Sequence, residues 1–273
     1  MKIGIIDSGI IKEYLVEEAR VISVENYIYD EIIDDVRRYK KYKNNNIHGT
    51  FVINAFHKYL KINCELYVCN VVNKESKGSS LSVIKALEHF KLIKELRIII
   101  MSLSVSNLFS DKLDELLQYY HNNGTLVIVS QNQHGMNNYL SESKYVNSIY
   151  SNNKITIGAM RRVNNIIFSN TEPEFIKAQN DRYFVFMGTS KAAPIVASLI
   201  ANNMHDSKIV IEDVGMILDN YQLKMQNNKN KKGDYEIKTI NVSYDNMILF
   251  CEKYLNLDKR DINKTSKDYL YKK

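Results

Sequence analysis

Proline, glycine and cysteine are scarce in this 273-residue sequence, which holds two Pro, ten Gly and three Cys. So little Pro and Gly excludes collagen-like and Gly/Pro-rich linker compositions. Hydrophobic residues make up 45% of the chain, which suffices for a sizeable core and excludes disorder of the chain as a whole. The length allows one large domain or two small ones. Because glycine is scarce, each glycine is a stronger indication that the backbone is constrained at its position.

Long apolar runs are also missing. No stretch approaches the roughly 20 apolar residues of a membrane helix, and Asp7 interrupts the N-terminus before a secretory apolar region could form. Cys64 and Cys69 lie five residues apart in an apolar run predicted to be a strand, so they should face opposite sides of it. With Cys251 they form neither a disulfide framework nor a metal site. These absences favour a soluble protein of a reducing compartment, the cytoplasm, with no membrane partner.

Positive charge is concentrated at the C-terminal end. The formal net charge is +6, and residues 224–273 supply +5 of it with twelve Lys and Arg against seven Asp and Glu. A basic segment can contact nucleic acid or anionic lipid, but this one lacks interleaved aromatic or helical patterning, which favours a solvated end and no nucleic-acid partner. We therefore divide the chain into a domain over residues 1–223 and a basic segment over 224–273 that packs on this domain or extends it.

Apolar runs alternate with amphipathic segments along most of the chain. Because strands that are apolar on nearly every residue alternate here with helix-length segments, they indicate a βαβ series with a parallel sheet. The expected fold class is α/β, with a doubly wound, mostly parallel sheet and helices on both faces. Strands are predicted over residues 2–6, 19–24, 65–72, 97–102, 125–130 and 154–159, and helices over 48–60, 80–93, 110–122 and 190–203.

Polar residues follow three of the predicted strands, where functional groups of an open parallel sheet gather. Asp7 follows the first strand, Ser102 to Ser104 follow the fourth, and Ser130 to Asn132 follow the fifth. The carboxyl edge of the sheet is therefore the place to look for chemistry.

Three short motifs supply the groups that amide hydrolysis by a serine needs: a hydroxyl, an imidazole and a carboxylate. Asp7 lies in Asp-Ser-Gly, His48 opens a predicted helix in His-Gly-Thr, and Ser190 opens another in Gly-Thr-Ser-Lys-Ala-Ala-Pro. The N-terminus of the helix predicted to begin at Ser190 offers backbone N–H groups and the positive end of the helix dipole. Pro194 is compatible with the first turn of that helix. Taken singly, Asp7 fits a turn cap as well, and His48 and Ser190 fit helix caps.

Together, and in the order Asp, His, Ser, these motifs resemble the subtilisin-like serine proteases, for which subtilisin is the standard example of that order. The Gly-Thr-Ser-x-Ala-x-Pro motif is the specific one, and the resemblance extends over about residues 1–220. It implies a serine endopeptidase with Asp7, His48 and Ser190 as catalytic residues. It also implies that Asn132 donates to the oxyanion.

The resemblance also indicates where substrate binds. Ser102, Leu103 and Ser104 resemble the family's substrate-binding strand, usually Ser-Leu-Gly, and Ser130 and Gln131 precede the oxyanion asparagine. The predicted strand that follows Asn132 includes residues 155–159, which match the family there.

Several residues depart from the family pattern. Ser104 replaces a glycine at the wall of the specificity pocket and Gln131 replaces a small residue, so both should narrow or polarise the pocket.

Lys191 stands where an apolar side chain is usual. Its charged group either points to solvent, which we favour, or assists an anionic intermediate. Phe51, where a histidine is common, should affect only packing. The family's metal-binding loops cannot be placed in residues 10–34. His57 follows His48 by nine residues, which directs the two side chains to opposite sides of a helix, so no metal or cofactor is predicted.

The printed chain starts five residues before its first strand ends, which leaves no room for an N-terminal inhibitory pro-segment. We therefore expect a cytoplasmic endopeptidase of narrow specificity acting on a peptide or protein, for example one that removes leader sequences. Two alternatives stay open: a catalytically silent, protease-like binding or scaffold protein, and a broad intracellular degradative protease.

Overall fold

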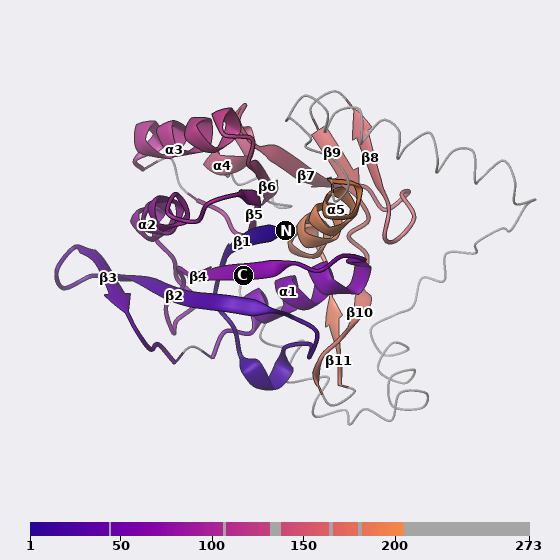
Figure 1. Ribbon diagram of the computed structural model, residues 1–273, viewed down its shortest axis with the longest axis horizontal. Helices are drawn as coiled ribbons and strands as arrows, with labels where there is room; N and C mark the ends of the chain where they lie inside the picture. Colours follow the sequence, from indigo (N-terminus) through magenta and orange to yellow (C-terminus); the bar gives the residue numbers. More distant parts are fainter. Residues whose placement is uncertain (44, 106–107, 132–137, 164–165, 180–181, 205–273) are drawn as a thin grey trace, which may run out of the picture.

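A nine-stranded sheet forms the centre of the protein in the computed structural model, which describes residues 1–204 except 44, 106–107, 132–137, 164–165 and 180–181 (Figure 1). The strand order is β3-β2-β4-β1-β5-β6-β7-β9-β8. All pairs between β2 and β9 are parallel, whereas β3 and β8 each close an edge of the sheet in antiparallel orientation. The predicted α/β class with a mostly parallel sheet is confirmed.

The elements have the following bounds. The strands of the large sheet are β1 (Lys2–Asp7), β2 (Val21–Asp30), β3 (Asp35–Tyr39), β4 (Glu65–Asn70), β5 (Leu96–Met101), β6 (Leu126–Ser130), β7 (Asn147–Ser151), β8 (Met160–Val163) and β9 (Ile166–Ser169). A separate antiparallel hairpin consists of β10 (Glu174–Lys177) and β11 (Tyr183–Phe186). The helices are η1 (Lys12–Tyr14), α1 (His48–Tyr59), α2 (Ser80–Phe90), α3 (Ser110–Asn122), α4 (Tyr139–Glu142) and α5 (Thr189–Met204).

Helices cover both faces of the sheet, because side chains of each strand point alternately to one face and the other. On one face Ile3 and Ile5 of β1 share a core with α1 and α5. On the other face Ile6 packs in a core with α2 and α3. Cys64 and Cys69 lie in these two different cores, as their odd spacing predicts, and both thiols are free. Burial raises the pKa of the Cys64 thiol to about 11, so it is inert at neutral pH.

One predicted strand is wrong. Residues 154–159 form turns, and the strand beside β6 is β7, which precedes them. Asn152 starts this turn region, since its side-chain oxygen accepts from the backbone N–H of Lys154 and its carbonyl accepts from the N–H of Ile155. Ile157 is 42% exposed whereas Ala159 is buried, so the apolar residues of this segment do not share one buried face. Asparagine turn chemistry prevailed over β propensity here.

The remaining predicted elements exist, with shifted ends. The helix over 110–122 has the predicted bounds, and the other helices and strands agree within a few residues, apart from β2, which extends to Asp30. Six strands were not predicted: β3 and β7 to β11. The boundary at residues 223 and 224 lies outside the described residues, and the division into two segments stays a prediction.

Candidate active site

Asp7 and His48 form a hydrogen-bonded pair at the carboxyl edge of the sheet. The Nδ1 atom of His48 lies 2.8 Å from Oδ1 of Asp7, and the N–H of Ser8 donates to the same oxygen at 2.7 Å. Asp7 is 2% exposed, whereas 20% of the His48 side chain is exposed. The imidazole also packs edge-on against Phe186, with ring centroids 5.7 Å apart. The ring is therefore fixed on two sides and open on another.

The environment of His48 favours its protonated form. Burial lowers the pKa of His48, but the charge of Asp7 and the hydrogen bond to it raise the pKa more, so the net shift is upward. A neutral imidazole whose Nδ1–H donates to a carboxylate has Nε2 available as a proton acceptor. The pair thus has the arrangement of a general base and its orienting acid.

Two small residues let helix α1 begin against the turn that follows β1. A Cβ atom at Gly49 would lie 2.3 Å from the carbonyl oxygen of Gly9, and Gly9 has a φ of +78°. The N–H of Gly49 donates to the Ser8 hydroxyl at 2.9 Å, and the hydroxyl of Thr50 accepts from the N–H of Ile11 at 2.8 Å. The Asp-Ser-Gly and His-Gly-Thr motifs therefore pack directly against each other, and this contact places His48 beside Asp7.

Ser190 is the second residue of α5, after a turn that several backbone contacts fix. Gly188 has a φ of +84°, and its N–H donates to the carbonyl of Thr171 at 2.8 Å. The hydroxyl of Thr189 donates to the carbonyl of Gln131 at 2.6 Å. The start of α5 is thereby tied both to the segment before β10 and to the segment after β6.

A reciprocal pair of hydrogen bonds joins Ser190 to Ser102. The Ser102 hydroxyl donates to the carbonyl of Ser190 at 3.1 Å, and the Ser190 hydroxyl donates to the carbonyl of Ser102 at 3.4 Å. The expectation for Pro194 needs correction, because Pro194 is the sixth residue of α5 and lies inside the helix. Proline has no N–H to donate to the carbonyl four residues earlier, which is that of Ser190. The Ser102 hydroxyl supplies the missing donor.

The register of the sheet brings these groups to one edge. Ile6 of β1 pairs with Met101 of the parallel neighbour β5, so the residues that follow, Asp7 and Ser102, lie side by side where the two strands end. Ser190 contacts Ser102, and Asp7 holds His48. Residues from four distant parts of the sequence therefore share the carboxyl end of the central strands, the usual location of sites in such sheets.

The segments predicted to bind substrate are held together by Asn138, which the sequence analysis missed. Its side-chain amide donates to the carbonyls of Leu103 (3.3 Å) and Ser130 (3.0 Å), and its oxygen accepts from the N–H of Val105 (3.1 Å). Asn138 is fully buried, and Ser104 between these contacts is exposed. No pattern in the sequence marks Asn138, because Leu103 and Val105 lie more than 30 residues away and the contact with Ser130 spans no regular element.

Gln131 and Asn132 differ in how far the structure describes them. The side-chain oxygen of Gln131 accepts a hydrogen bond from the hydroxyl of Ser141 on α4, whose neighbour Leu140 lies in the core. The backbone N–H of Gln131 donates to the carbonyl of Ile149 at 3.0 Å. Asn132 lies outside the described residues, so its oxyanion role stays a prediction. The same holds for the substrate-binding roles of Ser102, Leu103, Ser104, Ser130 and Gln131.

The favoured position of Lys191 is wrong. Its side chain is 0% exposed and does not reach solvent. Its Nζ atom donates to the carbonyl of Glu172 at 2.6 Å and pairs with the Glu174 carboxylate at 3.2 Å. In a helix the residue after Ser190 points about 100° away from it, which directs Lys191 into the protein here.

The comparison with protein families agrees with this geometry. The model described as the subtilase family matches residues 1–224. The chain belongs to the subtilase family. It therefore carries the domain of a serine peptidase, and its mostly parallel sheet with helices is consistent with the subtilisin-like α/β fold. A search of curated proteins finds no match to the chain.

Two further findings concern metal ligands and membrane-spanning helices in the part of the chain that the structure describes. Within residues 1–204, as far as the structure describes them, no three side chains of His, Cys, Asp or Glu lie close enough together to hold a metal ion. None of the described helices has the length and apolar character to span a membrane.

Proposed function

We propose that this subtilase is an active serine endopeptidase with Ser190 as nucleophile, His48 as general base and Asp7 as the residue that orients His48. The observation that carries the proposal is the hydrogen bond of 2.8 Å between His48 and Asp7, at the sheet edge where Ser190 contacts Ser102. The Asp-Ser-Gly, His-Gly-Thr and Gly-Thr-Ser motifs all lie at this edge of the sheet. This convergence favours catalysis over three unrelated capping roles.

In the proposed reaction the Ser190 Oγ atom attacks the scissile carbonyl carbon while Nε2 of His48 takes the hydroxyl proton. The side-chain amide of Asn132 donates to the oxyanion of the tetrahedral intermediate. The C–N bond then breaks, and His48 gives its proton to the leaving amine. Water hydrolyses the acyl-enzyme by the same steps, so Ser190 and His48 return to their initial states.

Labelling with a fluorophosphonate probe tests the nucleophile. Ser190 should be labelled in the folded protein, and labelling should disappear in Ser190→Ala and in His48→Ala. Replacing any one of the three residues should lower turnover by about 10⁴ to 10⁶, with multiple replacements far from additive. A folded wild-type protein that is not labelled would overturn the proposal and favour the silent binding or scaffold protein.

We also propose narrow specificity, supported by two side chains in the predicted pocket. The exposed Ser104 stands where relatives commonly have glycine, and a polar group rejects partners that lack a complementary group. Gln131 replaces a small residue, and because its side-chain oxygen is bonded to Ser141 it would narrow the pocket rather than offer that oxygen to substrate. Cleavage should therefore occur at few sites, with a polar or charged residue on the acyl side, as in leader removal. The natural substrate would be a peptide or protein in the cytoplasm, where free buried thiols such as those of Cys64 and Cys69 are stable.

Cleavage of a proteome-derived peptide library, read by mass spectrometry, tests this specificity. The variant with Ser104→Gly and Gln131→Gly should accept Phe and Leu more readily than the wild type. Efficient wild-type digestion of casein at many large apolar residues would contradict the proposal and favour a degradative protease.

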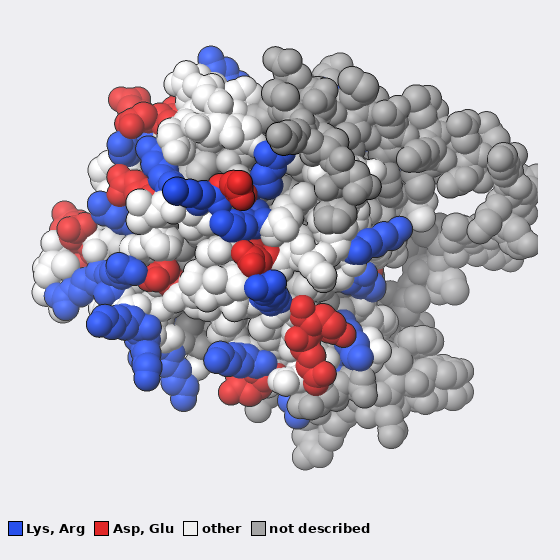
Figure 2. Space-filling model, in the orientation of Figure 1, with Lys and Arg blue, Asp and Glu red and all other residues white. Residues whose placement is uncertain are grey.

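Charge supports peptides over nucleic acid as partners. Figure 2 shows Lys and Arg side chains interspersed with Asp and Glu over the described part of one face. Nucleic-acid binding commonly needs a continuous basic surface, and its affinity falls steeply with salt. We expect no salt-dependent retention of the full-length chain on duplex DNA or RNA.

A further inference from the structure

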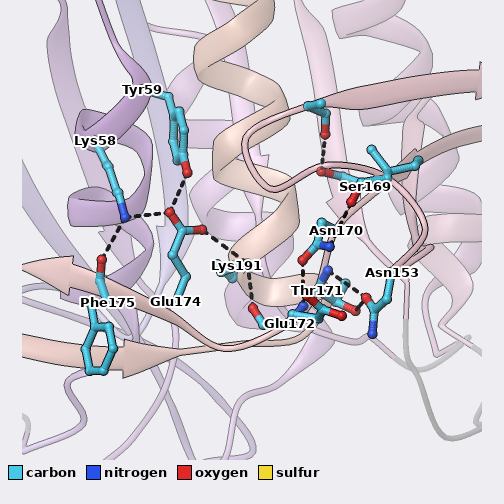
Figure 3. A network of polar contacts seen from close by, with 12 residues as sticks. Lys58, Tyr59, Asn153, Ser169, Asn170, Thr171, Glu172, Glu174, Phe175 and Lys191 are labelled. Atoms are coloured by element: carbon cyan, nitrogen blue, oxygen red, sulfur yellow. Dashed lines mark hydrogen bonds and ion pairs between the residues drawn. The ribbon is translucent and has the colours of Figure 1, made fainter. Parts of the chain in front are cut away.

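Glu174 lies at the centre of a group of polar contacts that the proposed reaction does not use (Figure 3). Its carboxylate accepts a hydrogen bond from the Tyr59 hydroxyl and pairs with Nζ of Lys58 at 2.5 Å and Nζ of Lys191 at 3.2 Å. The carboxylate thus receives donors from two helices, α1 and α5. Lys58 and Tyr59 close α1, and Lys191 lies in the first turn of α5.

These same two helices carry the proposed base and nucleophile. His48 is the first residue of α1, and Ser190 directly precedes Lys191 on α5. The hairpin that bears Glu174 also reaches the other end of α1, because Phe186 of β11 packs against the His48 ring. Glu174 and its hairpin therefore contact α1 near both ends, and α5 beside the nucleophile.

The central ion pair is shielded from water. Lys191 is 0% exposed and Glu174 is 7% exposed over its side chain, whereas Lys58 is 36% exposed. Burial raises the pKa of Glu174, but hydrogen bonds from Lys58 and Tyr59 and the charge of Lys191 lower it more, so the carboxylate stays ionised at neutral pH. Burial lowers the pKa of Lys191, and the charge of Glu174 opposes that shift.

The segment before Glu174 is itself fixed. The carbonyls of Thr171 and Glu172 accept from the N–H of Gly188 and from Nζ of Lys191, so they bracket Ser190. Asn153 accepts from the N–H and the hydroxyl of Thr171 at 3.1 and 2.8 Å, and Asn170 accepts from the N–H of Glu172 at 2.9 Å. Hydrogen bonds therefore fix the segment of residues 170–172 that leads to Glu174.

We propose that Glu174 and Lys191 are positioning residues, whose buried ion pair sets α5, with Ser190, against α1, with His48. The inference rests on the proposed function. A buried ion pair is weak evidence for stability, since apolar residues of similar volume often replace one without loss. Its geometric specificity is the property that an apolar contact lacks, because the carboxylate must meet donors from both helices at once. Small displacements of reacting groups have large effects on rate, on the order of 10²-fold for about 1 Å.

A double-mutant cycle with Lys191→Met and Glu174→Gln tests the pair. Lys191→Met keeps an unbranched side chain, and Glu174 would retain Lys58 and Tyr59, so this variant should fold. Glu174→Gln leaves a buried cation without a counterion and is the more disruptive change. For each variant kcat, KM, the rate of fluorophosphonate labelling of Ser190 and urea unfolding are measured.

Thr125→Val is the matched control for a buried polar contact far from the site. The Thr125 hydroxyl donates to the carbonyl of Leu96 at 2.7 Å, next to the amino end of β6. This variant should unfold at lower urea concentration while kcat and the labelling rate per folded molecule stay as in the wild type.

Each single variant of the pair should lower kcat and the labelling rate by about 10- to 100-fold with KM nearly unchanged. The loss in the double variant should be clearly smaller than the product of the single losses, since the residues act as a pair. Normal kcat and labelling in Lys191→Met, or losses that multiply, would overturn the positioning role. A wild-type protein that is not labelled would overturn the proposed function and this inference with it.

Discussion

At the scale of single residues, the electrostatics of His48 decide the pH range of the proposed activity. The net upward shift of its pKa comes from Asp7, which holds a proton on Nδ1 and opposes the effect of burial. A general base must be neutral to accept a proton. Activity should therefore be lost as pH falls through a raised pKa, at a higher pH than an isolated histidine would give.

The profile of kcat/KM against pH checks this expectation. Its acidic limb should have a midpoint above the ordinary pKa of histidine. Asp7→Asn should lower kcat by about 10⁴, because the tautomer of His48 is no longer held. His89→Gln should leave the limb in place, since His89 lies on α2 and burial lowers its pKa. A limb at or below the ordinary value would contradict the role of the Asp7–His48 pair.

At the scale of elements, the contact between α1 and the turn after β1 depends on the missing side chain of Gly49. A Cβ atom there would lie 2.3 Å from the carbonyl oxygen of Gly9, and backbone cannot move aside cheaply. Gly49→Ala should therefore displace the start of α1 and lower kcat by about 10² or more.

Gly124→Ala is the matched control for Gly49→Ala. Gly124 has a φ of +73° and nothing lies within 4 Å of its added Cβ, so only backbone strain of about 1 kcal/mol is expected. Activity per folded molecule should be unchanged. Equal kcat in Gly49→Ala and the wild type would show that α1 is not held as described.

Asn138 connects the two strand ends predicted to bind substrate. Asn138→Ala would remove hydrogen bonds to the buried Val105 and Ser130 and to the partly buried Leu103. The free energy of unfolding should fall by about 2 to 4 kcal/mol, since an unsatisfied buried group costs about 1 to 3 kcal/mol.

Urea unfolding and steady-state kinetics measure this effect, and KM should rise more than kcat falls because the binding segments separate. Asn123→Ala, which removes an exposed side-chain bond to the carbonyl of Tyr119 at the end of α3, should change neither quantity by much. Unchanged stability and KM in Asn138→Ala would refute the connecting role.

At the scale of the whole molecule, the buried carboxylate of Glu174 links stability to pH. The pKa of the Glu174 carboxyl is lower in the folded protein than in the unfolded chain, where the pKa of glutamate is about 4.3. Its contribution is therefore fully present above the unfolded pKa and is lost as pH falls through the folded pKa.

Urea unfolding between neutral and acidic pH checks this linkage. The wild-type free energy of unfolding should fall as acid protonates Glu174, and the decrease should be smaller in Glu174→Gln. Glu115→Gln, at an exposed ion pair with Lys112, should leave the profile nearly unchanged, since exposed pairs contribute little. Parallel profiles for the wild type and Glu174→Gln would contradict the assignment.

The sequence by itself determined the α/β class and most central elements. A short apolar run such as residues 97–102 is typical of a strand buried on both faces, since it is too short for a helix, and α3 follows from helical periodicity. The sequence predicts Asp7, His48 and Ser190 as site residues because each lies in a short motif, and the structure shows a backbone requirement in one of these motifs, the close approach at Gly49. Local chemistry and pattern thus sufficed for them.

Only the tertiary structure decided the rest. The apolar alternation at residues 154–159 lies in turns whose apolar residues do not share one buried face, which no local pattern reveals. Asn138, Glu174 and the buried position of Lys191 depend on partners that lie from 8 to 116 residues away, and a lone polar residue carries no mark of such a partner. Burial turns such side chains into specific contacts, because a buried polar group must find its partner within the fold.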